Sequence, residues 1–192
     1  MTNKDLKRRI IELSWKYHLS HLGSNFSAVD IIDEIYQTKN PDEKFILSEG
    51  HAGLALYCVI EKYKGIDAEY LWKTNEVHPH RNEQNDIWAS TGSLGQGLPI
   101  ALGMAMADRS KDVYCMISDG ECAEGSIWEA LSIKEKFKVD NLKIYASCNG
   151  YGAYDKIDIN RLEEKLKAFS PDIIVRRTAL EGYPLWLQGQ AA

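Results

Sequence analysis

The chain has 192 residues, 44% of them hydrophobic and 27% charged, a composition typical of one globular domain spanning residues 1–192. The formal net charge of −5 argues against a nucleic-acid-binding surface, because a phosphate backbone requires clustered lysines and arginines. The charged N-terminus lacks the apolar core of a signal peptide, and no segment suits a membrane span. We therefore expect a cytoplasmic protein that binds neither nucleic acid nor membrane.

Apolar periodicity predicts alternating helices and strands along the chain. Helices are expected at residues 4–18, from an N-cap at Ser27, and at 52–63, 93–108, 125–138 and 158–169. Short apolar runs predict strands at residues 45–47, 113–117, 142–148 and 173–175. Residues 66–90 are polar and irregular, so they are expected to form a long loop.

Strand and helix alternate through the second half of the chain, which predicts an α/β fold. The alternation is typical of a doubly wound, mostly parallel sheet with helices on both faces. Ligands of such sheets bind beyond the carboxyl ends of the strands. Asp119 and Asn149 each follow an apolar strand, so both are expected at that edge.

The four cysteines support a reduced environment. Cys58, Cys115, Cys122 and Cys148 form no CxxC pair and have no histidine at a spacing typical of zinc sites. Three of them lie in or beside runs that are expected to be buried. A reduced intracellular protein fits this pattern best.

A divalent cation site is predicted where Asp119 and Asn149 meet, because Mg²⁺ prefers oxygen ligands and usually keeps a phosphate in its shell. The glycine-rich run 91–97 could place backbone N–H groups against such a phosphate. Together these features suggest a diphosphate-bearing cofactor. Each has an ordinary alternative: Asp-Gly and Asn-Gly pairs usually form turns, and the glycines could serve helix packing.

Five segments resemble the N-terminal, diphosphate-binding half of transketolase. They are HLGSNFSAVDII, LSEGHAGLALY, STGSLGQGLPIALGMAMA, SDGECAEGSIWEAL and KVDNLKIYASCNG. The likeness covers residues 5 to about 155, and the segments occur in the order of the family. It implies the thiamine-diphosphate-binding fold, with thiamine diphosphate as cofactor.

The resemblance also implies which residues hold the metal and the substrate. Asp119 and Asn149 would bind Mg²⁺ (or Ca²⁺ or Mn²⁺) through their side chains, and Tyr151 through its backbone carbonyl. His51 would contact the diphosphate. The three candidate catalytic residues are His21, His51 and His78, with His21 and His78 near the thiazolium and the sugar.

The remaining cofactor contacts come from small residues and one acid. Gly92, Leu94, Gly120 and Asn149 would lie against the cofactor, with Leu94 near the aminopyrimidine. Glu124 would lie at the subunit interface, in the chain of carboxylates that links paired active sites. Its ordinary alternative is an acid favoured at a helix N-terminus.

The match departs from the family at several positions. Ser118 and Leu22 replace a usual glycine and a usual proline, and residues 79–89 differ from the expected shorter acidic segment. No histidine follows His80, although the family has a further diphosphate-contacting histidine. Arg176 or Arg177 would have to substitute for it.

Nothing after residue 155 resembles the pyrimidine-binding domain, which carries the glutamate that activates the cofactor. The expected function is therefore that of one half of a split transketolase, paired with a separate pyrimidine-binding C-terminal subunit. The expected assembly, with a homodimer core inside an α2β2 heterotetramer, would transfer a two-carbon ketol unit from a ketose, expected to be a sugar phosphate, to an aldose. The alternatives are a non-catalytic relic that binds cofactor or partner, and one half of a related ketol or deoxyxylulose-type synthase.

Overall fold

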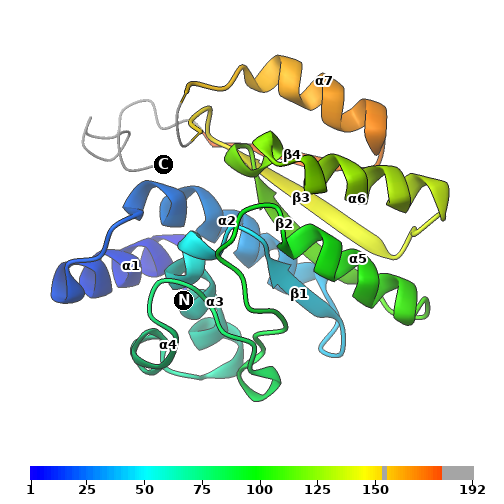
Figure 1. The fold of residues 1–192 in the computed structure, drawn as a ribbon. Helices are drawn as coiled ribbons and strands as arrows, with labels where there is room; N and C mark the ends of the chain where they lie inside the picture. The colour runs from blue at the N-terminus through cyan, green and yellow to red at the C-terminus, as the bar shows by residue number, and fades with distance from the viewer. Residues whose placement is uncertain (153–154, 179–192) are drawn as a thin grey trace.

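The computed structural model describes residues 1–152 and 155–178. At its centre lies a parallel sheet with the strand order β1-β2-β3-β4 (Figure 1). Its strands are β1 (Lys44–Leu47), β2 (Val113–Ser118), β3 (Leu142–Cys148) and β4 (Ile174–Arg177). The predicted positions of all four strands are confirmed to within two residues at each end.

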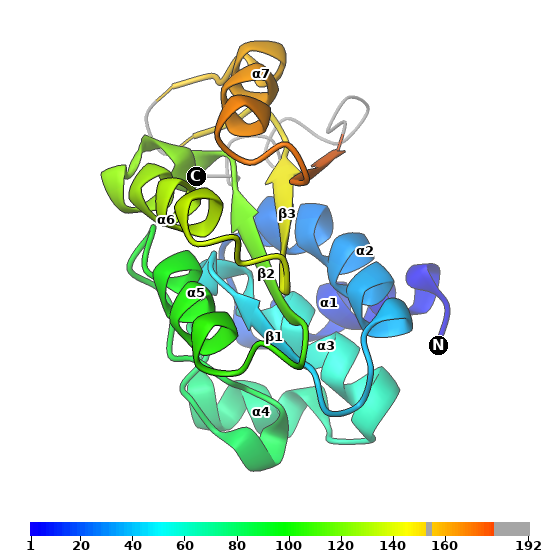
Figure 2. The same ribbon diagram turned by 90° about the vertical axis from the view of Figure 1, so that its right-hand side faces the viewer.

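Helices cover both faces of this sheet, as Figure 2 shows. The helices are α1 (Asn3–Tyr17), α2 (Leu22–Thr38), α3 (Gly53–Lys64), α4 (Ala68–Asn75), α5 (Gly97–Ala107), α6 (Gly125–Lys136) and α7 (Ile159–Phe169), with 3₁₀ turns at Gly50–Ala52, Glu83–Asn85 and Gly120–Ala123. The first four helices pack on one face and the last three on the other.

Alternate side chains of each strand enter opposite cores, which is why the strands read as continuous apolar runs. In β2, Tyr114 and Met116 join the core beneath α1, α2 and α3. Cys115 and Ile117 join the core beneath α5, α6 and α7. The predicted doubly wound α/β sheet is therefore confirmed.

The start of α2 differs from the prediction. The helix begins at Leu22, and His21 precedes it in a left-handed conformation with φ 60°. Ser27 lies inside the helix, where its hydroxyl donates to the carbonyl of Gly23 at 3.1 Å. The expected N-cap at Ser27 was wrong because a serine can also bond to the preceding turn of its own helix.

Residues 66–90 are more regular than expected, because α4 occupies part of the segment. The carboxylate of Asp67 caps this helix and accepts from the backbone N–H of Glu69 at 2.9 Å. Leu71 is fully buried. A capped helix of eight residues has too few apolar positions to show a clear period.

The four cysteines are buried and free, in line with the expected reduced state. No helix within the described ranges is both long and apolar enough to cross a bilayer.

Candidate functional site

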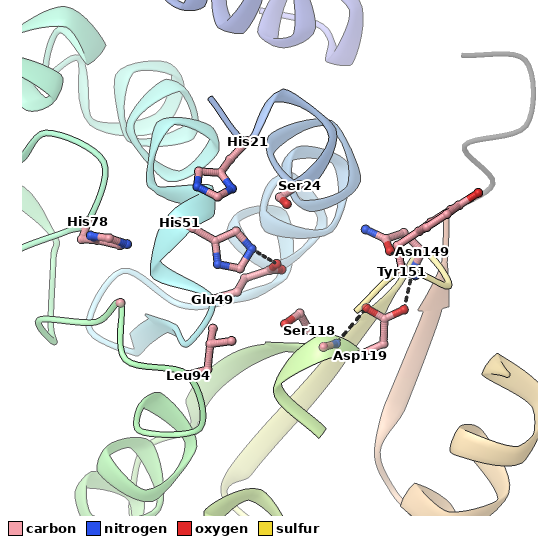
Figure 3. Close-up of a pocket in the computed structure, with 12 residues that line it drawn as sticks. His21, Ser24, Glu49, His51, His78, Leu94, Ser118, Asp119, Asn149 and Tyr151 are labelled. Carbon is pink, nitrogen blue, oxygen red and sulfur yellow. Dashed lines mark hydrogen bonds and ion pairs between the residues drawn. The ribbon is translucent and has the colours of Figure 1, made fainter. Parts of the chain in front are cut away.

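The carboxyl ends of β1, β2 and β3 meet at one edge of the sheet and border a cavity of about 230 Å³ (Figure 3). Glu49 and His51 follow β1, Asp119 follows β2, and Asn149 follows β3. The lining residues are His21, Ser24, Glu49, His51, His78, Gly92, Leu94, Ser118, Asp119, Gly120, Asn149 and Tyr151. Of the predicted site residues, every one except Glu124 is brought together here.

Asp119 is a buried carboxylate held by backbone groups. One oxygen accepts from the N–H groups of Asn149 and Gly150 at 2.9 and 2.7 Å, and the other from that of Gly120 at 3.0 Å. Burial outweighs these bonds and raises the pKa of Asp119 to about 6. Among the described residues no lysine or arginine lines the cavity, so the carboxylate lacks a cationic partner there. An added cation would supply one.

The neighbouring oxygens suit a hard cation. The side-chain oxygen of Asn149 accepts from the N–H of Tyr151 at 2.9 Å and retains a second lone pair. Within residues 1–152 and 155–178, no group of three or more His, Cys, Asp and Glu could hold a metal. One carboxylate, one amide oxygen and the Tyr151 carbonyl form a sparse oxygen set, which fits a Mg²⁺ ion that keeps a phosphate as ligand.

Three histidines face the same cavity from different segments. The ring centroids of His21 and His51 lie 5.2 Å apart. His21 has a left-handed backbone, and its Nδ1 is buried without a hydrogen-bond partner. Burial, with the neighbouring histidine charges, lowers the pKa of His21 and lowers that of His51 to about 4. Both imidazoles are therefore neutral near pH 7 and can accept a proton.

The low pKa of His51 should make the stability of the ligand-free chain depend on pH. Because the folded pKa is about 4 and the unfolded value about 6.5, this contribution is fully present above pH 6.5 and is lost as the pH falls through 4. The loss is up to about 3 kcal/mol. In urea titrations at several pH values, His51→Gln should show a shallower decline than the wild type. Parallel declines would contradict the assignment.

The glycine-rich loop approaches β1 and η1 (Gly50–Ala52) closely. A Cβ on Gly50 would lie 2.6 Å from the backbone nitrogen of Gly92, and a Cβ on Gly92 would lie 2.8 Å from the His78 ring. Gly92 and Leu94 thus reach the cavity as predicted. The N–H of Gly95, however, donates to Glu121 at 2.9 Å, so it is not available to a phosphate.

Four polar residues of this region were not predicted as site residues. Ser24, Glu49 and Ser118 line the cavity, and Glu121 lies directly beneath it with no exposed surface. The hydroxyl of Ser24 is buried and has no hydrogen-bond partner. The assumed N-cap at Ser27 placed Ser24 before the helix, although it belongs to the first turn.

Glu124 lies beside the cavity rather than in it. It borders an adjacent hollow of about 390 Å³ that shares Leu94, Asp119 and Gly120 with the first cavity. The side chain is exposed at the N-cap of α6 and makes no capping hydrogen bond. The predicted place at an interface between subunits stays a prediction.

Neither arginine replaces the missing histidine. Arg176 pairs with Glu34 of α2, its Nε lying 2.9 Å from the carboxylate. Arg177 pairs with Glu163 of α7, its two donors lying 3.2 and 2.6 Å from one oxygen. Neither residue lines the cavity, so that hypothesis was wrong.

Comparisons with known proteins agree with this geometry. Residues 16–176 match the family model described as transketolase, thiamine diphosphate binding domain. The chain is 29% identical to one of the subunits of the apulose-4-phosphate transketolase of Actinobacillus succinogenes, covering 88% of this chain and 71% of that protein. It is 31% identical to the equally named protein from Phocaeicola vulgatus, over 71% and 55% of the two chains.

Full-length transketolases are also similar, over a smaller part of their length. The transketolase of Pongo abelii is 36% identical over 61% of this chain but only 20% of its own. The crystal structure of transketolase from Campylobacter jejuni has the same fold, with a TM-score of 0.69 at 20% identity, over 91% of this chain and 36% of that one. With the family match spanning most of its length, this chain belongs to the transketolase family, as a thiamine-diphosphate-binding domain.

Proposed function

We propose that this chain is the diphosphate-binding subunit of a split transketolase, which transfers a two-carbon ketol unit from a ketose phosphate to an aldose. The observation that carries the proposal is the meeting of an oxygen ligand set, at Asp119 and Asn149, with three histidines in one cavity. Two relatives that are named as subunits of one transketolase support the split form.

The metal ligands would be the side chains of Asp119 and Asn149 and the backbone carbonyl of Tyr151. They would hold Mg²⁺, or Ca²⁺ or Mn²⁺ in its place, and through it the diphosphate. His51 and the unpartnered hydroxyl of Ser24 face the same space and can donate to phosphate oxygens.

The cofactor would rest on residues with little bulk. Gly92, Leu94 and Gly120 border the cavity between the histidines and the metal ligands. Thiamine diphosphate, when bound, supplies the stabilisation of carbanions on which such transfers depend. The protein's task is to orient it and to move protons.

The histidines would move those protons. His21 and His51 are neutral near pH 7 and can accept a proton from a substrate hydroxyl and return it. His78 faces them from the loop that follows α4. General acid–base catalysis of this kind typically contributes a factor of ~10²–10⁴ in rate.

A separate pyrimidine-binding subunit would complete the site, and two copies of this chain would form the core of an α2β2 assembly in the cytoplasm. Helix α5 supports a protein-covered surface, because it contains no charged residue yet exposes Pro99, Gly103 and Met106. A helix that is apolar on all sides is normally buried. The exposed Glu124 would lie at the same assembly's interface.

Reconstitution tests the proposal. The chain, the candidate partner and their mixture are assayed with thiamine diphosphate and Mg²⁺ for two-carbon transfer, with apulose 4-phosphate and unbranched ketose phosphates as donors. We expect activity only in the mixture, with a 2:2 mass by light scattering. A mixture that assembles but transfers nothing would favour a non-catalytic relic, and activity of the chain alone would contradict the split site.

A further inference from the structure

Glu49 is a buried acid in the cavity for which the proposed function gives no role. The residue is 3% exposed, and its Oε1 is buried without a hydrogen-bond partner. Its Oε2 lies 3.7 Å from Nε2 of His51, and Figure 3 shows the carboxyl directed at that ring. This separation is slightly longer than a hydrogen bond, as is common in ligand-free sites that tighten when a ligand binds.

The other buried acids of this region already have their partners. Asp119 accepts three backbone N–H groups, and Glu121 accepts from Ser48, Gly95 and Ser118. Glu49 has none of these donors, and no lysine or arginine borders the cavity in the described part of the chain. An ionised carboxylate is costly in such a place, whereas a protonated carboxyl is tolerated.

The surrounding charges favour the same form. Burial, followed by the charges of Glu121 and Asp119, raises the pKa of the Glu49 carboxyl well above its usual range. The remaining titratable groups of the cavity are His21, His51 and His78. His51 is neutral near pH 7, so it carries one proton on one of its two ring nitrogens.

We propose that Glu49 is a positioning residue: its carboxyl O–H donates to Nε2 of His51 and so places the imidazole proton on Nδ1. The tautomer of a histidine is set by the hydrogen bond that its other nitrogen makes. A bare Nε2 facing the carboxyl leaves Nδ1–H as a neutral donor for an anionic oxygen in the cavity. With an ionised Glu49 the proton would lie on Nε2, and Nδ1 would present a lone pair to that oxygen.

Histidine ring nitrogens can be read directly in the cofactor-free chain. Long-range ¹H–¹⁵N spectra of ¹⁵N-histidine-labelled protein at pH 7 distinguish protonated from bare nitrogens, and the signals lost in His51→Gln identify residue 51. We expect Nδ1 to be protonated in the wild type and in Glu49→Gln, whose amide can still donate. We expect Glu49→Ala to lose this preference. A wild-type ring protonated at Nε2, or an unchanged ring in Glu49→Ala, would overturn the proposal.

A functional consequence rests on the proposed transketolase assembly and is measured separately. In the reconstituted enzyme, Glu49→Ala should weaken thiamine diphosphate binding about 10-fold, as loss of an outer-shell partner does, and Glu49→Gln should largely restore it. An enzyme without transferase activity but with the Nδ1–H tautomer would contradict the proposed function and leave the role of Glu49 supported. Equal binding by the wild type and Glu49→Ala would count against that role.

Discussion

Replacing Asp119 with alanine is expected to reduce Mg²⁺-dependent binding of thiamine diphosphate by at least ~100-fold, because even outer-shell partners of a metal typically contribute 10–100-fold. The side chain is the only carboxylate among the proposed ligands, and it is 3% exposed. Isothermal calorimetry of the chain together with its partner measures the effect. Binding should also vanish in the wild type when a chelator removes the metal.

A matched control separates this effect from a general loss of negative charge. Asp155 is exposed and borders the adjacent hollow rather than the metal ligands. Asp155→Ala should bind within about threefold of the wild type, in line with the small effects of most surface substitutions. If Asp119→Ala bound equally well, the proposed ligand set would be wrong.

The sheet was predictable because its strands carry a simple signal. Residues 142–148 and 113–117 are uninterrupted apolar runs, and burial on both faces produces that pattern. The start of α2 was not predictable, because it depends on His21 adopting a left-handed conformation that histidines seldom adopt. Short α4 escaped for the different reason that eight residues hardly define a period.

The site was predicted where chemistry and position coincide. Asp119 and Asn149 follow strands, and parallel strands present their carboxyl ends at one edge. Glu49 and Glu121 were missed because a glutamate in a polar turn usually faces solvent. Only the packing of the glycine loop against β1 reveals that both are buried.

Glu121 should be the residue of this region on which the fold depends most. Its carboxylate joins three segments: one oxygen accepts from Ser48 at 2.6 Å and Gly95 at 2.9 Å, and the other from the N–H of Ser118 at 3.0 Å. The residue has no exposed surface. Burial raises the pKa of Glu121, while these donors lower it. The acid therefore ties the glycine loop to the ends of β1 and β2.

Truncation of Glu121 to alanine should cost about 3–5 kcal/mol of the free energy of unfolding, because each buried donor left without an acceptor costs about 1–3 kcal/mol. Urea denaturation at constant m-value measures the loss. Glu121→Gln keeps one acceptor oxygen and should cost less, whereas Glu124→Ala, at an exposed glutamate three residues later, should stay within about 0.5 kcal/mol of the wild type. Equal stability of Glu121→Ala and Glu124→Ala would show that the loop is held by packing alone. If the loop does depend on Glu121, the alanine variant should also weaken cofactor binding, because Leu94 would lose its fixed place beside the cavity.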